Sequence, residues 1–179
     1  GEELQSNSPR IAGIAGSGQG GLSRFEVTAG DVSANIIALV ADGDGGEGIL
    51  GNATTATGTG GRAGGAGGGG GPVQITDGGA VPDGGLGGTL TASEVVLLAR
   101  GRGGVSSGSG ATGQGGDVSL DASDINVQIG TALRMFAAGI GGDAVSGDGG
   151  TAVGGNAEVG ILSGQAGTLS VQGLAEVVA

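Results

Sequence analysis

Three aspartates near the middle of the chain come closest to a catalytic arrangement. Alternating apolar residues around Asp117, Asp121 and Asp124 predict that all three lie on the solvent-facing side of strands. Glycoside hydrolysis uses two carboxyl groups that flank one bond. The sequence has no His, Tyr or Lys to support such a site, and no other segment repeats the trio. We therefore expect no enzymatic activity. The alternative to a structural role is a carbohydrate-binding or carbohydrate-cleaving face at Asp117, Asp121 and Asp124.

A second acidic group, Asp42, Asp44 and Glu47, lies among glycines. Carboxylate oxygens are calcium ligands, so these three residues are the candidates for a metal. The intact nonapeptide repeat of calcium-binding β-rolls is absent from the sequence. We expect these acids to be solvated turn residues and the chain to need no cofactor, with calcium as the one alternative.

Glycine clusters could also cradle a phosphate. Gly-Gln-Gly-Gly occurs at Gly18–Gly21 and again at Gly113–Gly116. Phosphate-binding loops need a helix directly after the glycines, and a P-loop needs a lysine. Neither condition is met, so these glycines are expected to form tight corners with positive φ.

The sequence predicts that the segments that position these residues are strands. Between 113 and 143, apolar residues alternate with polar ones, pause at Ser123-Asp124, and resume at Ile125. The same order recurs over 18–46, and shorter versions occupy 87–104 and 164–179. Glycine disfavours helix nearly everywhere, and 131–138 is too short for a stable helix, so strand is expected there too.

Glycine-rich connectors of different lengths separate these units, at 43–71, 101–116 and 139–167. Constant strand pairs with variable connectors are typical of a solenoid, in which insertions leave the stack on one side. The sequence predicts an all-β fold, a parallel β-helix or β-solenoid with inward rows of Val, Ile, Leu and Ala. We expect residues 1–17 to be an N-terminal arm or linker and 18–179 to be one domain of irregular coils.

Composition excludes several classes of function. The net charge is −11, and all six basic residues are Arg, which disfavours binding to nucleic acid or anionic membranes. No apolar run approaches the ~20 residues of a membrane helix, so membrane insertion is not expected. Of 179 residues, 49 are Gly, two are Phe and none is Cys. Stability must therefore come mainly from backbone ladders.

The final residues form a strand pattern without a polar cap, and an uncapped solenoid end tends to pair with another strand. This predicts end-to-end stacking into a homo-oligomer or filament, or continuation in a longer chain. The absence of an initial Met likewise indicates a processed, truncated or partial chain. The residues of this predicted self-assembly edge are Leu174, Ala175, Glu176, Val177, Val178 and Ala179.

The repeated unit resembles a known family. Gly88–Ala92 reads Gly-Thr-Leu-Thr-Ala, Gly167–Val171 reads Gly-Thr-Leu-Ser-Val, and Val118–Ala122 is a looser copy. With an aliphatic strand and Gly-x-Gly-Gly after it, this unit resembles filamentous-haemagglutinin-like and autotransporter-type adhesin passengers over most of 18–179. The resemblance implies a right-handed parallel β-helix at the bacterial cell surface that acts as an adhesin or filament. The partner that it implies is a surface receptor or glycan. The tract 58–71 departs from that pattern: its glycine period of three suits either packed polyproline-II-like strands or a flexible linker.

Overall fold

The computed structural model describes residues 18–27, 30–45, 68–69, 73–76, 88–106, 109–145, 147–161 and 166–179. The predicted arm at 1–17, the calcium candidate Glu47 and most of the glycine tract 58–71 lie outside these residues. Within the described part of the chain every regular element is a strand, and no helix there is long and apolar enough to cross a membrane.

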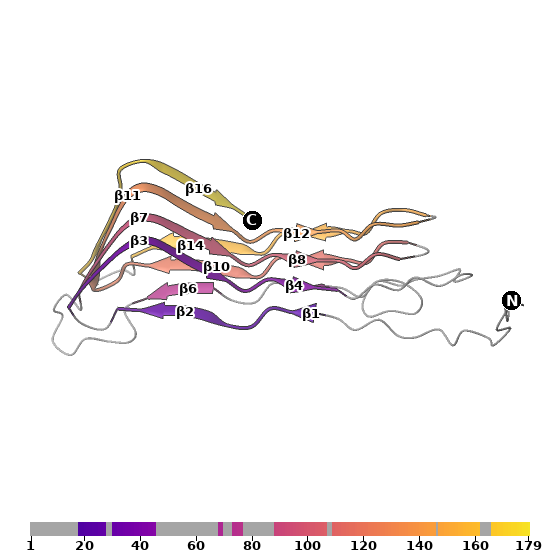
Figure 1. The fold of residues 1–179 in the computed structure, drawn as a ribbon, viewed down its shortest axis with the longest axis horizontal. Coiled ribbons are helices and arrows are strands. Elements are labelled where there is room, and N and C mark those ends of the chain that lie inside the picture. Colours follow the sequence, from indigo (N-terminus) through magenta and orange to yellow (C-terminus); the bar gives the residue numbers. More distant parts are fainter. Residues whose placement is uncertain are drawn as a thin grey trace, which may run out of the picture.

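The described residues contain sixteen strands, which form four parallel sheets, here called A to D (Figure 1). Sheet A contains β1 (Gly18–Gln19), β5 (Gly68–Gly69), β9 (Gly113–Gln114) and β13 (Ala152–Val153). Sheet B contains β2 (Ser23–Glu26), β6 (Val73–Thr76), β10 (Asp117–Asp121) and β14 (Asn156–Gly160). Sheet C contains β3 (Asp31–Val40), β7 (Gly88–Leu98), β11 (Ile125–Phe136), β15 (Thr168–Val171) and β16 (Leu174–Val178). Sheet D contains β4 (Gly43–Asp44), β8 (Gly101–Arg102) and β12 (Gly139–Ile140).

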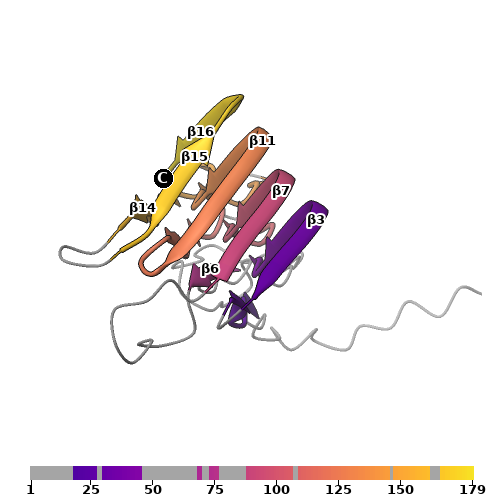
Figure 2. The same cartoon turned by 90° about the vertical axis from the view of Figure 1, so that its left-hand side faces the viewer.

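The chain visits the sheets in the order A, B, C, D three times, and a fourth time through A, B and C. We call these visits layers 1 to 4: β1–β4, β5–β8, β9–β12 and β13–β16. Each layer pairs in parallel with the one before it, so the strands of sheet C lie side by side in sequence order (Figure 2). The predicted all-β fold of stacked parallel strands is confirmed.

In-register rows of aliphatic side chains fill the interior. Because side chains alternate along a strand, one row in each pair points inward. In sheet B, Phe25, Ile75, Leu120 and Val159 share a row, and Leu120 is 1% exposed. In sheet C one row contains Val32, Leu90, Val127 and Leu169, and another contains Leu39, Leu97, Met135 and Val177. The predicted inward positions of Val, Ile, Leu and Ala are confirmed for this core.

Sheet C bends at a corner that divides each of its layers into two halves. In layers 1 and 2 one residue, Asn35 or Ser93, separates the halves. In layer 3 Gly130-Thr131 separates them, and the register of β11 on β7 shifts by one residue there. In layer 4, Gln172-Gly173 separates β15 from β16. The stack therefore tolerates a two-residue corner above a one-residue corner.

Short strands of sheets A and D form a thin projection that we call the glycine arm (Figure 1). β12 lies against β13, and β8 against β9, with glycine backbones in direct contact. A Cβ placed on Gly113 would come within 2.0 Å of the carbonyl oxygen of Ile140. The amide of Gly142 donates to the carbonyl of Ala111 across the two sheets (2.8 Å). Backbone contacts therefore replace a side-chain core in this part of the fold.

The glycine arm corrects two expectations. The segments 43–71, 101–116 and 139–167 are not merely connectors, because their described residues include strands of the ladders. Positive φ is also not the main reason for the glycines: among the described glycines only Gly30 and Gly147 have it. In the glycine arm, glycine is needed because two backbones approach so closely that a Cβ would clash.

The outer face of sheet C is polar in one half, and in the other half an apolar row lies beside charged residues such as Glu94 and Arg134. Before the corner it carries the row Ser33, Thr91, Gln128 and Ser170. After the corner it carries the row Val40, Leu98, Phe136 and Val178. Val, Ile, Leu and Ala were expected to form inward rows, so the outward position of Val40, Leu98 and Val178 differs from that expectation.

Candidate assembly edge and acidic clusters

The predicted aspartate trio is spread along layer 3. Asp117 and Asp121 lie at opposite ends of β10 and share its outer face, about 13 Å apart at 3.3 Å per residue. Asn156 of layer 4 donates its side-chain amide to Asp117 (2.8 Å). Asp121 accepts the backbone amide (2.9 Å) and the hydroxyl of Ser123. Asp117 therefore binds the neighbouring strand β14, and Asp121 stabilises the corner that follows β10.

Asp124 does not face solvent, so that part of the prediction is wrong. Its side chain is 4% exposed and its backbone has the left-handed φ of 56°. Its carboxylate accepts the backbone amide of Ala166, in layer 4 (3.0 Å). Aspartate tolerates the left-handed region better than most residues, and burial is compensated by this hydrogen bond. Asp124 therefore stabilises the corner and the contact between two layers.

The trio does not converge on one point. Glycoside-cleaving carboxyl groups stand roughly 5–9.5 Å apart on either side of the scissile bond. Asp117 and Asp121 are more widely separated along their strand, and Asp124 is buried at a corner. The arrangement in the structure favours structural roles for all three residues.

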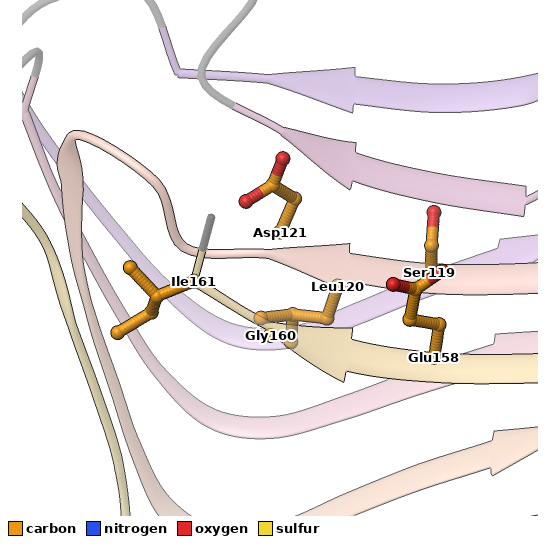
Figure 3. Close-up of a pocket in the computed structure, with 6 residues that line it drawn as sticks. All are labelled: Ser119, Leu120, Asp121, Glu158, Gly160 and Ile161. Atoms are coloured by element: carbon orange, nitrogen blue, oxygen red, sulfur yellow. The ribbon is translucent and has the colours of Figure 1, made fainter. Parts of the chain in front are cut away.

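Sheet B has two hollows of mixed polar and apolar lining that the sequence did not indicate. One, of about 240 Å³, is lined by Ser119, Leu120, Asp121, Glu158, Gly160 and Ile161 (Figure 3). The other, of about 640 Å³, extends from Gln74 past Asp117 and Asn156 to Ala179. Figure 3 shows Ser119 beside its register partner Glu158, with Asp121 further along β10. Both hollows depend on register between strands, which sequence spacing does not determine.

Asp42 and Asp44 of layer 1 lie beside arginines of layer 2. Asp44 of β4 pairs in register with Arg102 of β8, and Asp42 lies beside Arg100. The Arg100 guanidinium donates to Asp42 through Nη2 (2.6 Å) and Nε (3.2 Å), and the Arg100 amide donates to Asp42 Oδ1 (2.9 Å). Both oxygens of Asp42 are therefore occupied by Arg100.

This ion pair changes the ionisation of both groups. Burial would raise the pKa of Asp42, but the hydrogen bonds and positive charge of Arg100 outweigh it and hold the pKa below 3.8. The hydrogen bond to Asp42 in turn raises the pKa of Arg100. No group of three or more potential metal-ligating side chains occurs among the described residues. Two guanidinium groups at Asp42 and Asp44 oppose a cation there.

The Asp42–Arg100 pair predicts a pH-dependent stability difference. Since the folded pKa of Asp42 is lowered, its contribution is present above the unfolded value near 3.8 and is lost as pH falls through the folded value. Asp42→Asn keeps the amide acceptor and removes the charge. We expect it to cost up to about 1 kcal/mol at pH 7 and less at pH 2, where protonation of Asp42 weakens the ion pair.

Chemical denaturation of wild type and Asp42→Asn at both pH values checks this expectation. The exposed Asp148, changed to Asn, is the matched control and should show a smaller difference at pH 7. An equal cost of Asp42→Asn at pH 2 and pH 7 would contradict the role of its charge.

Layer 4 presents the open edge of the stack. β14 pairs only with β10, and β15 and β16 pair only with β11, within the described residues. Their other backbone edge has no partner strand there. The predicted edge residues 174–179 lie on this end, as Figure 1 shows for β16. Apolar side chains are exposed on the same layer: Val153 41%, Val159 37%, Ile161 42%, Leu174 51%, Val177 47% and Val178 40%.

Comparisons of the chain with protein-family models, with curated proteins and with solved structures found no match.

Proposed function

We propose that this chain is a structural segment of an extracellular bacterial surface fibre. In this proposal it is a right-handed parallel β-solenoid that assembles end to end through layer 4. The observation that carries the proposal is the open edge of β14, β15 and β16, which combines unpaired strand backbone with exposed Leu174, Val177 and Val178. Such an edge is a template for another strand.

The interior supports a structural role. The core consists of continuous aliphatic rows, and the glycine arm is held by backbone contacts between layers. The aliphatic rows of sheets B and C repeat along one axis in all four layers, so another layer extends them without a new kind of contact. The cell-surface location in this proposal comes from the resemblance of Gly88–Ala92 and Gly167–Val171 to adhesin passenger repeats.

Assembly of the purified chain tests the proposal. We expect elongated particles by negative-stain electron microscopy and a sedimentation coefficient that rises with protein concentration. Salt near 0.5 M should promote assembly, because the net charge of −11 opposes it and salt screens that charge.

Val178→Lys places a charge on the outer face of the open edge, where Val178 is 40% exposed, and should leave monomers. Ile140→Lys is the matched control, since Ile140 is 38% exposed in β12 of the glycine arm and lies outside β14, β15 and β16. Uniform monomers of the wild-type chain at all concentrations and salt conditions would overturn the proposal.

A further inference from the structure

We infer that the partner at the open edge is layer 1 of a second copy of this chain, held in one defined register. This inference rests on the proposed function and names the partner and the contacts. We call the contact between layer 4 of one copy and layer 1 of the next the joint. In the joint, β2 of the second copy continues sheet B beyond β14, and β3 continues sheet C beyond β15 and β16. Within the described residues, β2 pairs only with β6 and β3 only with β7, so this edge also has a free side.

The rows of sheet B fix the register. Ser23, Val73, Val118 and Ala157 occupy one row, and the next row contains Arg24, Gln74, Ser119 and Glu158. A second copy that continues these rows places its Ser23 on Ala157. Its Arg24 then lies on Glu158, and its Phe25 lies on Val159.

Charge favours this register. The second of these rows starts with the cation Arg24 at layer 1 and ends with the anion Glu158 at layer 4. The uncharged Gln74 and Ser119 lie between them. Opposite charges directly across neighbouring strands stabilise their pairing. Arg24 already contacts Glu26 (2.7 Å), and its side chain remains 41% exposed. In the joint Glu26 lies on Gly160, which has no side chain, so Arg24 can contact Glu26 and Glu158 together.

Apolar residues match in sheet C. Continuing the rows places Val32 and Ala34 of the second copy on Leu169 and Val171. After the corner, the exposed Ile36 (57%) and Val40 (50%) of the second copy cover Leu174 and Val178. Leu39 covers Val177 in the inward row. Every exposed apolar residue of β16 thus meets an apolar residue of β3.

The corners also match a geometry that the chain already contains. Layer 4 has a two-residue corner, Gln172-Gly173, and layer 1 has a one-residue corner at Asn35. The joint therefore sets two residues beside one. β11 and β7 make this same combination between Ile129 and Ala132. The joint is a head-to-tail contact that does not close, so it generates a filament with a repeat of about 19 Å, four strand spacings per copy.

Paired cysteines test the register in a chain that has no cysteine of its own. Within one copy, β6 and β10 separate positions 24 and 158, about 14 Å or three strand spacings, beyond the ~7 Å reach of a disulfide. In the joint the two Cα atoms lie about 4.8 Å apart. The double variant Arg24→Cys/Glu158→Cys should therefore form a ladder of covalent multimers under mild oxidation, seen on a non-reducing gel.

The control pair is Arg24→Cys/Asn156→Cys, whose positions are offset by two residues in the joint, about 8 Å apart. We expect at least tenfold less multimer from it, and no species beyond dimer from either single variant of the first pair. Reduced variants are checked by electron microscopy for assembly.

Filaments without the ladder, or equal ladders from both pairs, would overturn the register and leave the proposed function standing. Absence of both filaments and covalent multimers would overturn the two proposals together.

Discussion

Gly113→Ala is expected to destabilise the chain by about 3 kcal/mol or more and to separate sheet A from sheet D in the glycine arm. The added Cβ would lie 2.0 Å from the carbonyl oxygen of Ile140 and 2.5 Å from that of Gly101. Both atoms belong to backbone in neighbouring strands, so relief requires the two sheets to separate. No rotamer change can remove the clash.

Gly160→Ala is the matched control, because it makes the same substitution within a strand where a Cβ would meet nothing within 4 Å. Its stability should be unchanged or slightly higher, since alanine restricts the unfolded chain. Thermal unfolding followed by far-ultraviolet circular dichroism measures both variants, as the chain has no Trp or Tyr for fluorescence. Equal stability of the two variants would contradict the close backbone packing of the arm.

Leu97→Ala is expected to cost about 2–5 kcal/mol, the usual range for a buried leucine. Leu97 is fully buried in layer 2, between Leu39 and Met135 of the neighbouring layers. Truncation leaves a cavity along the inward row. Because neighbouring strands are fixed by their ladders on both sides, they cannot collapse into that cavity.

The control for this variant is Leu174→Ala in the same sheet, where the leucine is 51% exposed in layer 4. Its cost to the monomer should stay below about 1 kcal/mol, in proportion to the apolar area that it buries. Urea unfolding at a protein concentration that keeps the chain monomeric gives both free energies. A Leu97→Ala cost no larger than that of Leu174→Ala would show that the aliphatic rows do not hold the stack together.

Sequence reasoning found the strands whose side chains alternate. Around Val118, Leu120, Ile125 and Val127 the period of two is regular, and the structure places these residues in β10 and β11 with their apolar side chains inside. The segment 131–138 was also expected to be strand, and β11 continues through it to Phe136. One buried face per strand leaves a signal in the order of residue types, so such strands can be predicted.

The glycine arm could not be predicted in the same way. A strand such as β9 or β12 contributes two residues, one or both of them glycine, and has no side-chain alternation to detect. Its contacts are between backbones, and backbone atoms are the same for every residue type. The glycines therefore resembled those of ordinary connectors.

The acidic clusters show a second limit on what the sequence alone can predict. Asp124 follows Ser123 at a polar corner, which suggested exposure, but the layer above buries it and supplies the amide of Ala166. Asp42 is separated from Arg100 by 58 positions, and only the register of layers 1 and 2 brings them together. Contacts along the stacking axis depend on how many residues each layer contains, and that number varies along the chain.

The glycine arm also affects how stability varies with temperature. Unfolding it exposes peptide groups and little hydrocarbon, whereas unfolding the aliphatic rows exposes hydrocarbon. Apolar exposure raises the heat capacity by about 0.45 cal/mol/K per Å², and polar exposure lowers it by about 0.26. The two parts of each layer therefore act in opposite directions, and the heat-capacity change per residue falls below the ~12–15 cal/mol/K of ordinary globular domains. A small heat-capacity change flattens the stability curve, so layers of this kind lose less stability on cooling than a hydrocarbon core of the same size.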